Sequence, residues 1–112
     1  MLISIENAEH YVWGGNCDGW YLLKSNDISV IQERVPPGGS EMMHYHERAR
    51  QFFYVLEGEG IMTLEDREVT LQKGQGLEIV PLTKHQFKNS SQEDVHFLVI
   101  SAPSTRGERI NL

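Results

Sequence analysis

The sequence predicts an all-β domain built as a sandwich or barrel of two facing sheets. Short apolar segments recur along the 112 residues, with turn-forming residues between them. No stretch of helical length shows a sustained apolar period of 3.6 residues. Strands this short and evenly spaced would leave long open edges in a single sheet, and two apposed sheets avoid that exposure.

Nine segments have the length and apolar content of strands. In chain order they are 20–23, 28–35, 42–46, 51–56, 60–64, 68–71, 76–80, 86–88 and 95–101. Six of the connections contain the Gly, Pro or Asn residues that turns require, namely 14–16, 25–27, 36–39, 57–60, 74–76 and 89–91. The connection at 65–67, Glu-Asp-Arg, is a weaker turn signal because it lacks a glycine for a positive φ.

Length and composition fit one globular domain that covers residues 1–112. Hydrophobic residues make up 39% of the chain and charged residues 23%, the balance of an ordinary folded protein. The longest apolar runs, 52–56 and 97–100, are far shorter than the roughly 20 residues that cross a bilayer. The N-terminus lacks the basic and apolar parts of an export signal, so we expect a cytoplasmic protein without a membrane span.

The net charge argues against a nucleic-acid partner, and the cysteine content limits the kinds of metal site. With 16 acidic and 10 basic side chains, the net charge of -6 repels a phosphate backbone, so no nucleic-acid partner is expected. Cys17 is the only cysteine, which rules out an intramolecular disulfide and a thiolate-rich zinc site. A bound metal would need nitrogen and oxygen ligands.

Three histidines and a glutamine form the strongest candidate for such a site. His44 and His46 are separated by one residue, which on a strand points both imidazoles to the same face, with their Cα atoms roughly 6.6 Å apart. The polar segment 47–50 can reverse the chain and bring Gln51 back beside them, and His85 follows another apolar strand. This spacing alone does not prove that the four side chains converge.

The first part of this region resembles the first sequence motif of the cupin family. That motif contains a glycine, five residues, His-x-His, three or four residues, a glutamate, six residues and a glycine. Gly38, His44, His46 and Gly58 match it, and Gln51 stands where the glutamate belongs. A glutamine offers an oxygen lone pair without a negative charge, so a bound divalent ion would keep its full formal charge.

The second cupin motif follows in register. Gly74, His85 and Asn89 match it, whereas Val80 takes the place of its proline and Leu82 that of its second glycine. The resemblance spans about residues 28–101, with the first motif at about 38–58 and the second at about 74–89.

This resemblance implies a single cupin domain with a jelly-roll barrel, also called a double-stranded β-helix. It also implies one divalent metal in the barrel mouth, held by His44, His46, Gln51 and His85, and assembly as a homodimer. Such nitrogen and oxygen ligands suit Zn, Fe, Mn, Ni and Cu alike, so they do not select the element. A barrel that has lost its metal is the alternative interpretation of these histidines.

Strand parity suggests which other side chains face the site. Met42, Phe53, Val55 and Phe87 share the parity of the ligands on their strands and are candidates for lining a pocket, although core packing explains them equally well. His96 lies outside both motifs, yet its strand is expected to pass near the mouth, which makes it a further candidate.

Apolar side chains of the opposite parity indicate a dimer. Phe52, Tyr54 and Leu56 would leave the outer face of their strand apolar, and a second copy of the chain would cover it.

Two functions are compatible with these features. The first is a metal-dependent enzyme, of isomerase or dioxygenase type, that acts on a small organic acid, sugar acid or related metabolite. The second is a non-catalytic module that binds a small ligand or a metal. The ligand is expected to be small, and the neutral donor set favours an anion because it leaves the metal positively charged. No residue stands out in the sequence as a general acid or base.

Overall fold

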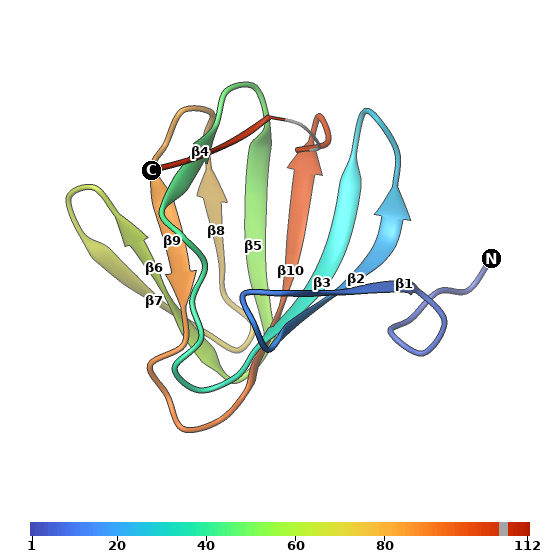
Figure 1. Cartoon of the computed structure of the whole chain (residues 1–112), viewed down its shortest axis with the longest axis horizontal. Helices are drawn as coiled ribbons and strands as arrows, with labels where there is room; N and C mark the ends of the chain where they lie inside the picture. The colour runs from blue at the N-terminus through green and yellow to red at the C-terminus, as the bar shows by residue number, and fades with distance from the viewer. Residues whose placement is uncertain (106–107) are drawn as a thin grey trace.

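The structure is a computed structural model that describes residues 1–105 and 108–112, and its strands form two antiparallel sheets (Figure 1). The six-stranded sheet has the order β1 (Glu9–Trp13), β2 (Cys17–Lys24), β3 (Ser29–Val35), β10 (Val95–Ala102), β5 (Arg50–Glu57) and β8 (Gly76–Ile79). The five-stranded sheet has the order β11 (Arg109–Asn111), β4 (His44–His46), β9 (His85–Lys88), β6 (Glu59–Leu64) and β7 (Glu68–Gln72). The all-β prediction is confirmed.

From β3 onward the chain passes repeatedly between the two sheets. β3, β5, β8 and β10 belong to the six-stranded sheet, and the strands between them in sequence belong to the other. The two sheets therefore wind together along the chain, and Figure 1 shows them curving around a common interior. This is the jelly-roll barrel that the resemblance implied.

Each of the nine expected strands is present, and two further strands were not anticipated. β1 contains Glu9 and His10 among its five residues, so its apolar content is too low to mark it. β11 has only three residues and forms by pairing with β4. β4 itself begins at His44, two residues later than expected, so Met42 and Met43 precede the strand.

The hydrophobic core lies where inward-facing side chains of both sheets meet. Phe87 of β9 and Phe97 of β10 are fully buried or nearly so, and their ring centroids are 4.1 Å apart. Phe53 of β5 stacks beside both rings, with centroids about 6 Å away. Val55 and Met62 are completely buried in the same cluster. This aromatic cluster fills one part of the interior and leaves the region around the histidines to polar side chains.

Positive φ angles, which favour glycine, occur in several turns, among them the turns at Gly58 and Leu82 within the two cupin motifs. Gly58, between β5 and β6, has a φ of 78°, and a Cβ there would lie 2.4 Å from the carbonyl oxygen of Asp94. Leu82 has a φ of 71°, and its N–H donates to the carbonyl of His46 over 2.7 Å. The turn before β9 thus keeps a left-handed conformation although leucine replaces the glycine of the motif, and a hydrogen bond to the histidine strand holds it there.

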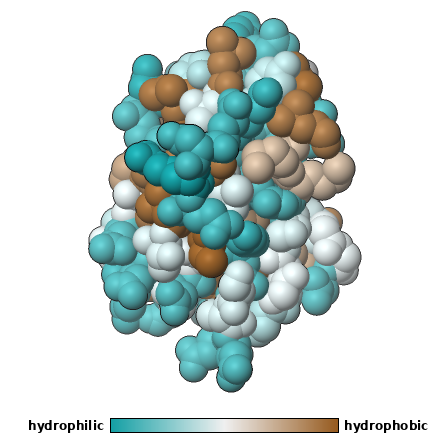
Figure 2. Space-filling model, turned by 90° about the vertical axis from the view of Figure 1, so that its left-hand side faces the viewer, coloured by the Kyte–Doolittle hydropathy of each residue, from teal (hydrophilic) through white to brown (hydrophobic). Residues whose placement is uncertain are grey.

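The outer faces of the two sheets differ. On the six-stranded sheet, Phe52 and Tyr54 of β5 are 41% and 36% exposed and stack on each other. Figure 2 views the opposite side, over the five-stranded sheet, where hydrophobic residues form separate groups among hydrophilic ones. Among the described residues, no helix has the length and apolar character needed to cross a membrane.

Candidate metal centre

Three histidines from two neighbouring strands converge inside the barrel. His44 and His46 both point inward from β4, and His85 lies directly across from His44 on β9. One nitrogen from each imidazole can be chosen so that the three lie within 4.8 Å of one another. All three side chains are buried, with exposed fractions of 2%, 5% and 0%. These three residues could hold a metal ion.

Backbone carbonyls orient two of the rings. The Nδ1–H of His44 donates to the carbonyl of Met42 over 2.7 Å, and the Nδ1–H of His85 donates to the carbonyl of Thr83 over 2.8 Å. In both rings this arrangement leaves Nε2 with a free lone pair, the tautomer that binds a metal. Nε2 of His85 and Nδ1 of His46 are buried and have no hydrogen-bond partner among the described residues.

The histidines are neutral at physiological pH. Burial, more than any other factor, lowers the pKa of His44 to about 3 and that of His46 to about 4. Burial also lowers the pKa of His85. A histidine must be deprotonated to bind a metal, so burial keeps the three imidazoles in the form that can act as ligands.

Gln51 presents an oxygen atom to the same space. Its Nε2 donates to the hydroxyl of Ser101, which faces it on β10, over 3.1 Å. This contact leaves Oε1 buried without a partner among the described residues. Buried polar atoms normally find a partner, so the unpaired oxygen and the unpaired histidine nitrogens fit a donor set for a cation.

A cavity of about 270 Å³ opens beside these residues. His44, His46 and Gln51 line one part of it, and Phe53 lines it as well. This volume lies just below the range of about 300 to 1,000 Å³ for sites of drug-sized ligands, so it suits a metabolite of a few carbon atoms.

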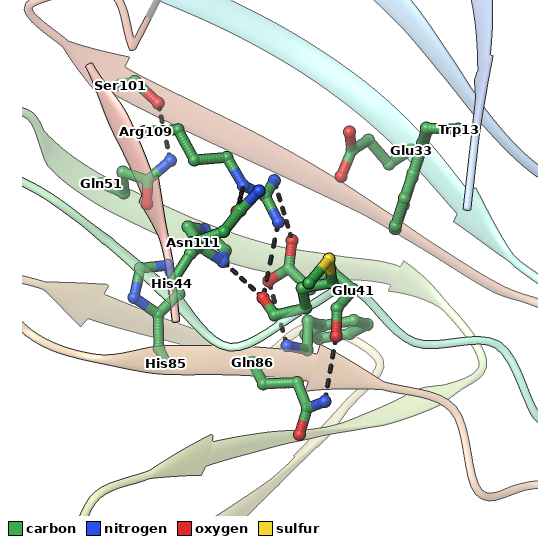
Figure 3. A network of polar contacts seen from close by, with 12 residues as sticks. Trp13, Glu33, Glu41, His44, Gln51, His85, Gln86, Ser101, Arg109 and Asn111 are labelled. Carbon is green, nitrogen blue, oxygen red and sulfur yellow. Dashed lines mark hydrogen bonds and ion pairs between the residues drawn. The ribbon is translucent and has the colours of Figure 1, made fainter.

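The rest of the cavity wall comes from residues that sequence reasoning did not select. Several of them are aromatic or charged, namely Tyr11, Trp13, Tyr21, Glu33, Glu41 and Arg109. Figure 3 shows Arg109 and Glu41 lying between the histidines on one side and Glu33 and Trp13 on the other. The cavity therefore joins the histidine cluster to a second group of charged side chains.

Burial controls the charge of the two carboxyl groups. It raises the pKa of Glu33 to about 7, although a hydrogen bond from Tyr11 and the charge of Arg109 oppose the rise. Burial and then the nearby charge of Glu33 raise the pKa of Glu41 to about 8, against the influence of Arg109. Near neutral pH, each carboxyl group can therefore hold or release a proton.

Four of the five predicted pocket-lining residues lie elsewhere. Phe53 lines the cavity, but Val55 and Phe87 are completely buried in the core, as the core alternative predicted. Met42 is 57% exposed, because it precedes β4 and the strand parity does not extend to it. His96 alternates with the inward-facing residues of β10 and stacks on Trp20 at the outer face.

One of the missed residues carried a signal in the sequence. Glu33 shares the parity of Ile31 and Val35 on β3, so it is a charged residue between two apolar ones on the same strand face. Arg109 gave no comparable signal, because only the pairing of β11 with β4, which places Arg109 across from His46, brings it to the cavity.

Comparison with known proteins identifies related sequences. The family model for the cupin domain matches residues 31–101. An uncharacterized protein of Methanocaldococcus jannaschii is 32% identical over 82 residues, which are 73% of this chain and 66% of that protein. The oxalate-binding protein of Thermotoga maritima is 28% identical over 67 residues, 60% of this chain and 55% of that protein. The matched regions thus span less than two thirds of both relatives.

The fold has close counterparts among solved structures. The polyketide cyclase RemF from Streptomyces resistomycificus superposes with a TM-score of 0.86 at 21% identity, covering 100% of this chain and 84% of that one. At this level of identity the likeness concerns the fold alone.

Proposed function

The chain belongs to the cupin family, and on that premise we propose that it is a metal-dependent enzyme acting on a small, oxygen-rich organic acid. One divalent ion would be held by His44, His46, Gln51 and His85. The observation that carries the proposal is the convergence of three buried, neutral histidines beside an unpaired glutamine oxygen. Isomerisation and dioxygenation are the two reaction types that fit such a site.

The chemistry of the donor set defines what the ion would do. A divalent ion bound there would act as a Lewis acid on a substrate oxygen or as a site of O₂ activation. The nitrogen and oxygen donors accept Zn, Fe, Mn, Ni or Cu, so the element is left to experiment. Because none of the four ligands is charged, the ion would attract an anionic substrate.

The positive charge of Arg109 in the cavity wall also favours an anionic ligand. Its guanidinium lines the cavity, with Nη1 3.9 Å from Oε2 of Glu41. Nε donates to Oδ1 of Asn111 and Nη2 to the carbonyl of Met42, and each Nη atom carries a second N–H that can donate to a ligand. An Arg side chain binds a carboxylate through two parallel hydrogen bonds. The name of the Thermotoga maritima relative, an oxalate-binding protein, points to the same class of ligand.

That name also favours a second function, a module that binds a small acid without converting it. Both functions require the same metal site and differ only in turnover. Metal-loaded protein that binds small dicarboxylates tightly, yet converts none of a panel of oxo, hydroxy and uronic acids with or without O₂, would favour the binding module.

The metal site can be tested with the full chain. Elemental analysis after exposure to each candidate metal is expected to find about one ion per chain in the wild type. The double variant His44→Ala/His85→Ala should lose that ion, whereas the control His96→Ala on the outer face should keep it. If the double variant retains its full metal content, the assignment of the ligands is wrong.

We also propose that the protein is a homodimer. The support is the exposed pair Phe52 and Tyr54 on the outer face of the six-stranded sheet, which a second copy would shield from water. Light scattering at micromolar concentration should give the mass of two chains, and the substitutions Phe52→Glu and Tyr54→Glu together should give that of one. A wild-type monomer at that concentration would contradict the proposal.

A further inference from the structure

Glu33 is a charged residue on a face where its neighbours along the strand are apolar. It points inward from the middle of β3, between Ile31 and Val35, and faces the fully buried Phe97 on the adjacent β10. Burying a carboxyl group in this environment costs free energy unless the group has partners or a function. Glu33 also lines the cavity that contains the histidines and Gln51.

A tyrosine on a nearby strand binds this carboxyl group. Tyr11 on β1 donates its hydroxyl hydrogen to Oε2 of Glu33 over 2.8 Å. The Tyr11 ring occupies the space over Gly19, where an added Cβ would lie 2.1 Å from a ring carbon. Any residue other than glycine at position 19 would displace the ring, so three strands contribute to the placement of a single hydrogen bond.

The second carboxyl group of the cavity is engaged differently. Oε1 of Glu41 accepts the backbone N–H of Phe87 over 3.0 Å, and its Oε2 faces the guanidinium of Arg109. Both oxygens of Glu41 therefore have protein partners. Within the described part of the chain, the hydroxyl of Tyr11 is the only hydrogen-bond partner of Glu33, which leaves Oε1 of Glu33 available to a ligand.

We propose that Glu33 is the proton-transferring residue of the cavity and that Tyr11 is its positioning residue. The substrate class is a small acid with a carbonyl group next to a carbon that bears hydrogen, such as a 2-oxo acid. This inference rests on the proposed function, since the histidine site would bind the oxygen atoms of the same substrate.

The proton transfer balances without any further reactant. A carboxylate oxygen of Glu33 takes the proton from the carbon next to the carbonyl group. The electron pair of the broken C–H bond forms the C=C bond of an enolate, and the carbonyl π electrons move to its oxygen. Glu33, now a carboxylic acid, returns a proton to the same carbon. The C=C electron pair forms the new C–H bond and the C=O bond is restored, which regenerates the carboxylate and completes one exchange with solvent.

The surroundings of Glu33 suit this cycle near neutral pH. Its pKa of about 7 makes both protonation states accessible, which is the condition for efficient general acid–base catalysis. The titratable and charged groups that face it are Tyr11 from β1, Cys17 and Tyr21 from β2, Glu41 before β4, and Arg109 from β11. The hydrogen bond from Tyr11 holds the pKa lower than burial alone would set it, so its loss should raise that pKa.

The first test uses 2-oxoglutarate as the probe in D₂O with the metal-loaded full chain. Proton NMR should show that the wild type accelerates exchange of the hydrogens at C3. Glu33→Gln should slow this exchange by about 100-fold or more while the metal content stays unchanged. Glu59→Gln, which changes an exposed carboxylate elsewhere, should match the wild type.

The second test needs neither metal nor turnover. In the metal-free protein with ¹³C-labelled glutamate carboxyl carbons, the resonance that disappears in Glu33→Gln should titrate near pH 7. Tyr11→Phe should move that midpoint, and the pH profile of the exchange reaction, to higher pH. A purely structural Tyr11 would lower stability without shifting either curve.

The outcomes separate this inference from the proposed function. A wild type that exchanges the probe equally well with and without metal contradicts the metal-dependent function but leaves Glu33 testable through its variant. Exchange that survives in Glu33→Gln, or a Glu33 midpoint near the ordinary pKa of about 4.5, overturns the inference. Absence of exchange in the metal-loaded wild type overturns it as well, because the substrate class would then be wrong.

Discussion

The cavity and the core of this barrel are lined by side chains of the same strands. On β5 and on β9, the residue at the cavity and the first residue in the core are two positions apart. On β9, His85 belongs to the histidine cluster and Phe87 to the aromatic core. On β5, Gln51 borders the cavity, Phe53 touches both regions, and Val55 is entirely within the core. A step of two residues keeps the same strand face, and on both strands the step from the cavity residue replaces a polar side chain by an apolar one.

This difference separates two roles within one interior: the aromatic core stabilises the fold, and the polar region around the cavity is available to a ligand. In the core, the rings of Phe53, Phe87 and Phe97 contact one another and carry no polar atom that needs a partner. Around the cavity, buried atoms such as Oε1 of Gln51 and Nε2 of His85 lack protein partners. An unsatisfied buried polar group costs roughly 1 to 3 kcal/mol of stability. The cavity therefore keeps lone pairs available to a metal or ligand and lowers the stability of the fold.

The largest expected effect of a single substitution is found by comparing two positions on β9. In the metal-free protein, Phe87→Ala should lower the free energy of unfolding by about 3 to 5 kcal/mol, because it leaves a void beneath Phe97 and Phe53. His85→Ala, on the same face, should cost less than about 2 kcal/mol, because it also removes an unpaired nitrogen. Urea unfolding measures both values.

Phe87→Leu is the matched control, in case Phe87→Ala loses so much stability that it does not fold. It keeps most of the apolar volume and should cost less than about 1.5 kcal/mol. Equal losses for Phe87→Ala and His85→Ala would show that the core and the histidine cluster are not separate regions.

The second comparison uses pH to separate the cavity from the core. Glu33 and Glu41 have folded-state pKa values of about 7 and 8, above the ordinary value of 4.5. Their contribution to stability is therefore complete below about pH 4.5 and is lost as pH rises through 7 to 8. Glutamine does not titrate, so Glu33→Gln/Glu41→Gln should gain stability relative to the wild type between pH 5 and pH 8.

The expected relative gain is up to about 6 kcal/mol, since one pKa unit corresponds to about 1.4 kcal/mol and the two groups together lose about 4.5 units of protonation free energy between these pH values. Urea unfolding of the metal-free proteins at the two pH values gives the difference, and the exposed Glu59→Gln should show none. A difference that stays constant with pH would mean that both carboxyl groups are ionised in the folded protein as they are in water.

The sequence predicted the parts of the molecule that depend on local pattern. The spacing of His44 and His46 defines their common strand face, and glycine-rich turns mark most of the strand ends. The remaining parts depend on contacts between distant segments. Arg109 reaches the cavity only through the pairing of β11 with β4, and Tyr11 only through the pairing of β1 with β2. Short edge strands of this kind carry little apolar pattern of their own.

Strand parity also failed where a strand was assumed to be longer than it is. Counting from His44 back to Met42 placed that methionine inside the barrel, whereas β4 begins at His44 and Met42 lies mostly in solvent. The alternation rule holds only within the hydrogen-bonded strand, and strand ends are the least certain feature of a sequence-based prediction.

The smallest expected effect concerns Gln51, the residue where the cavity begins on β5. Gln51→Glu keeps the size and shape of the side chain, and the hydroxyl of Ser101 can rotate to donate to the new carboxylate, so the free energy of unfolding at pH 7 should change by less than about 1 kcal/mol. The added negative charge should raise metal affinity by about tenfold or more and weaken oxalate binding to the metal-loaded protein by a similar factor. It should also raise the pKa of metal-bound water, because the ion would carry one positive charge less.

Calorimetric titration with one metal and then with oxalate measures the effects of Gln51→Glu on metal affinity and on oxalate affinity. Gln92→Glu, an exposed change with the same chemistry, should leave both affinities unaltered. Unchanged affinities in Gln51→Glu would place the side chain of Gln51 outside the ligand set and leave a site of three histidines.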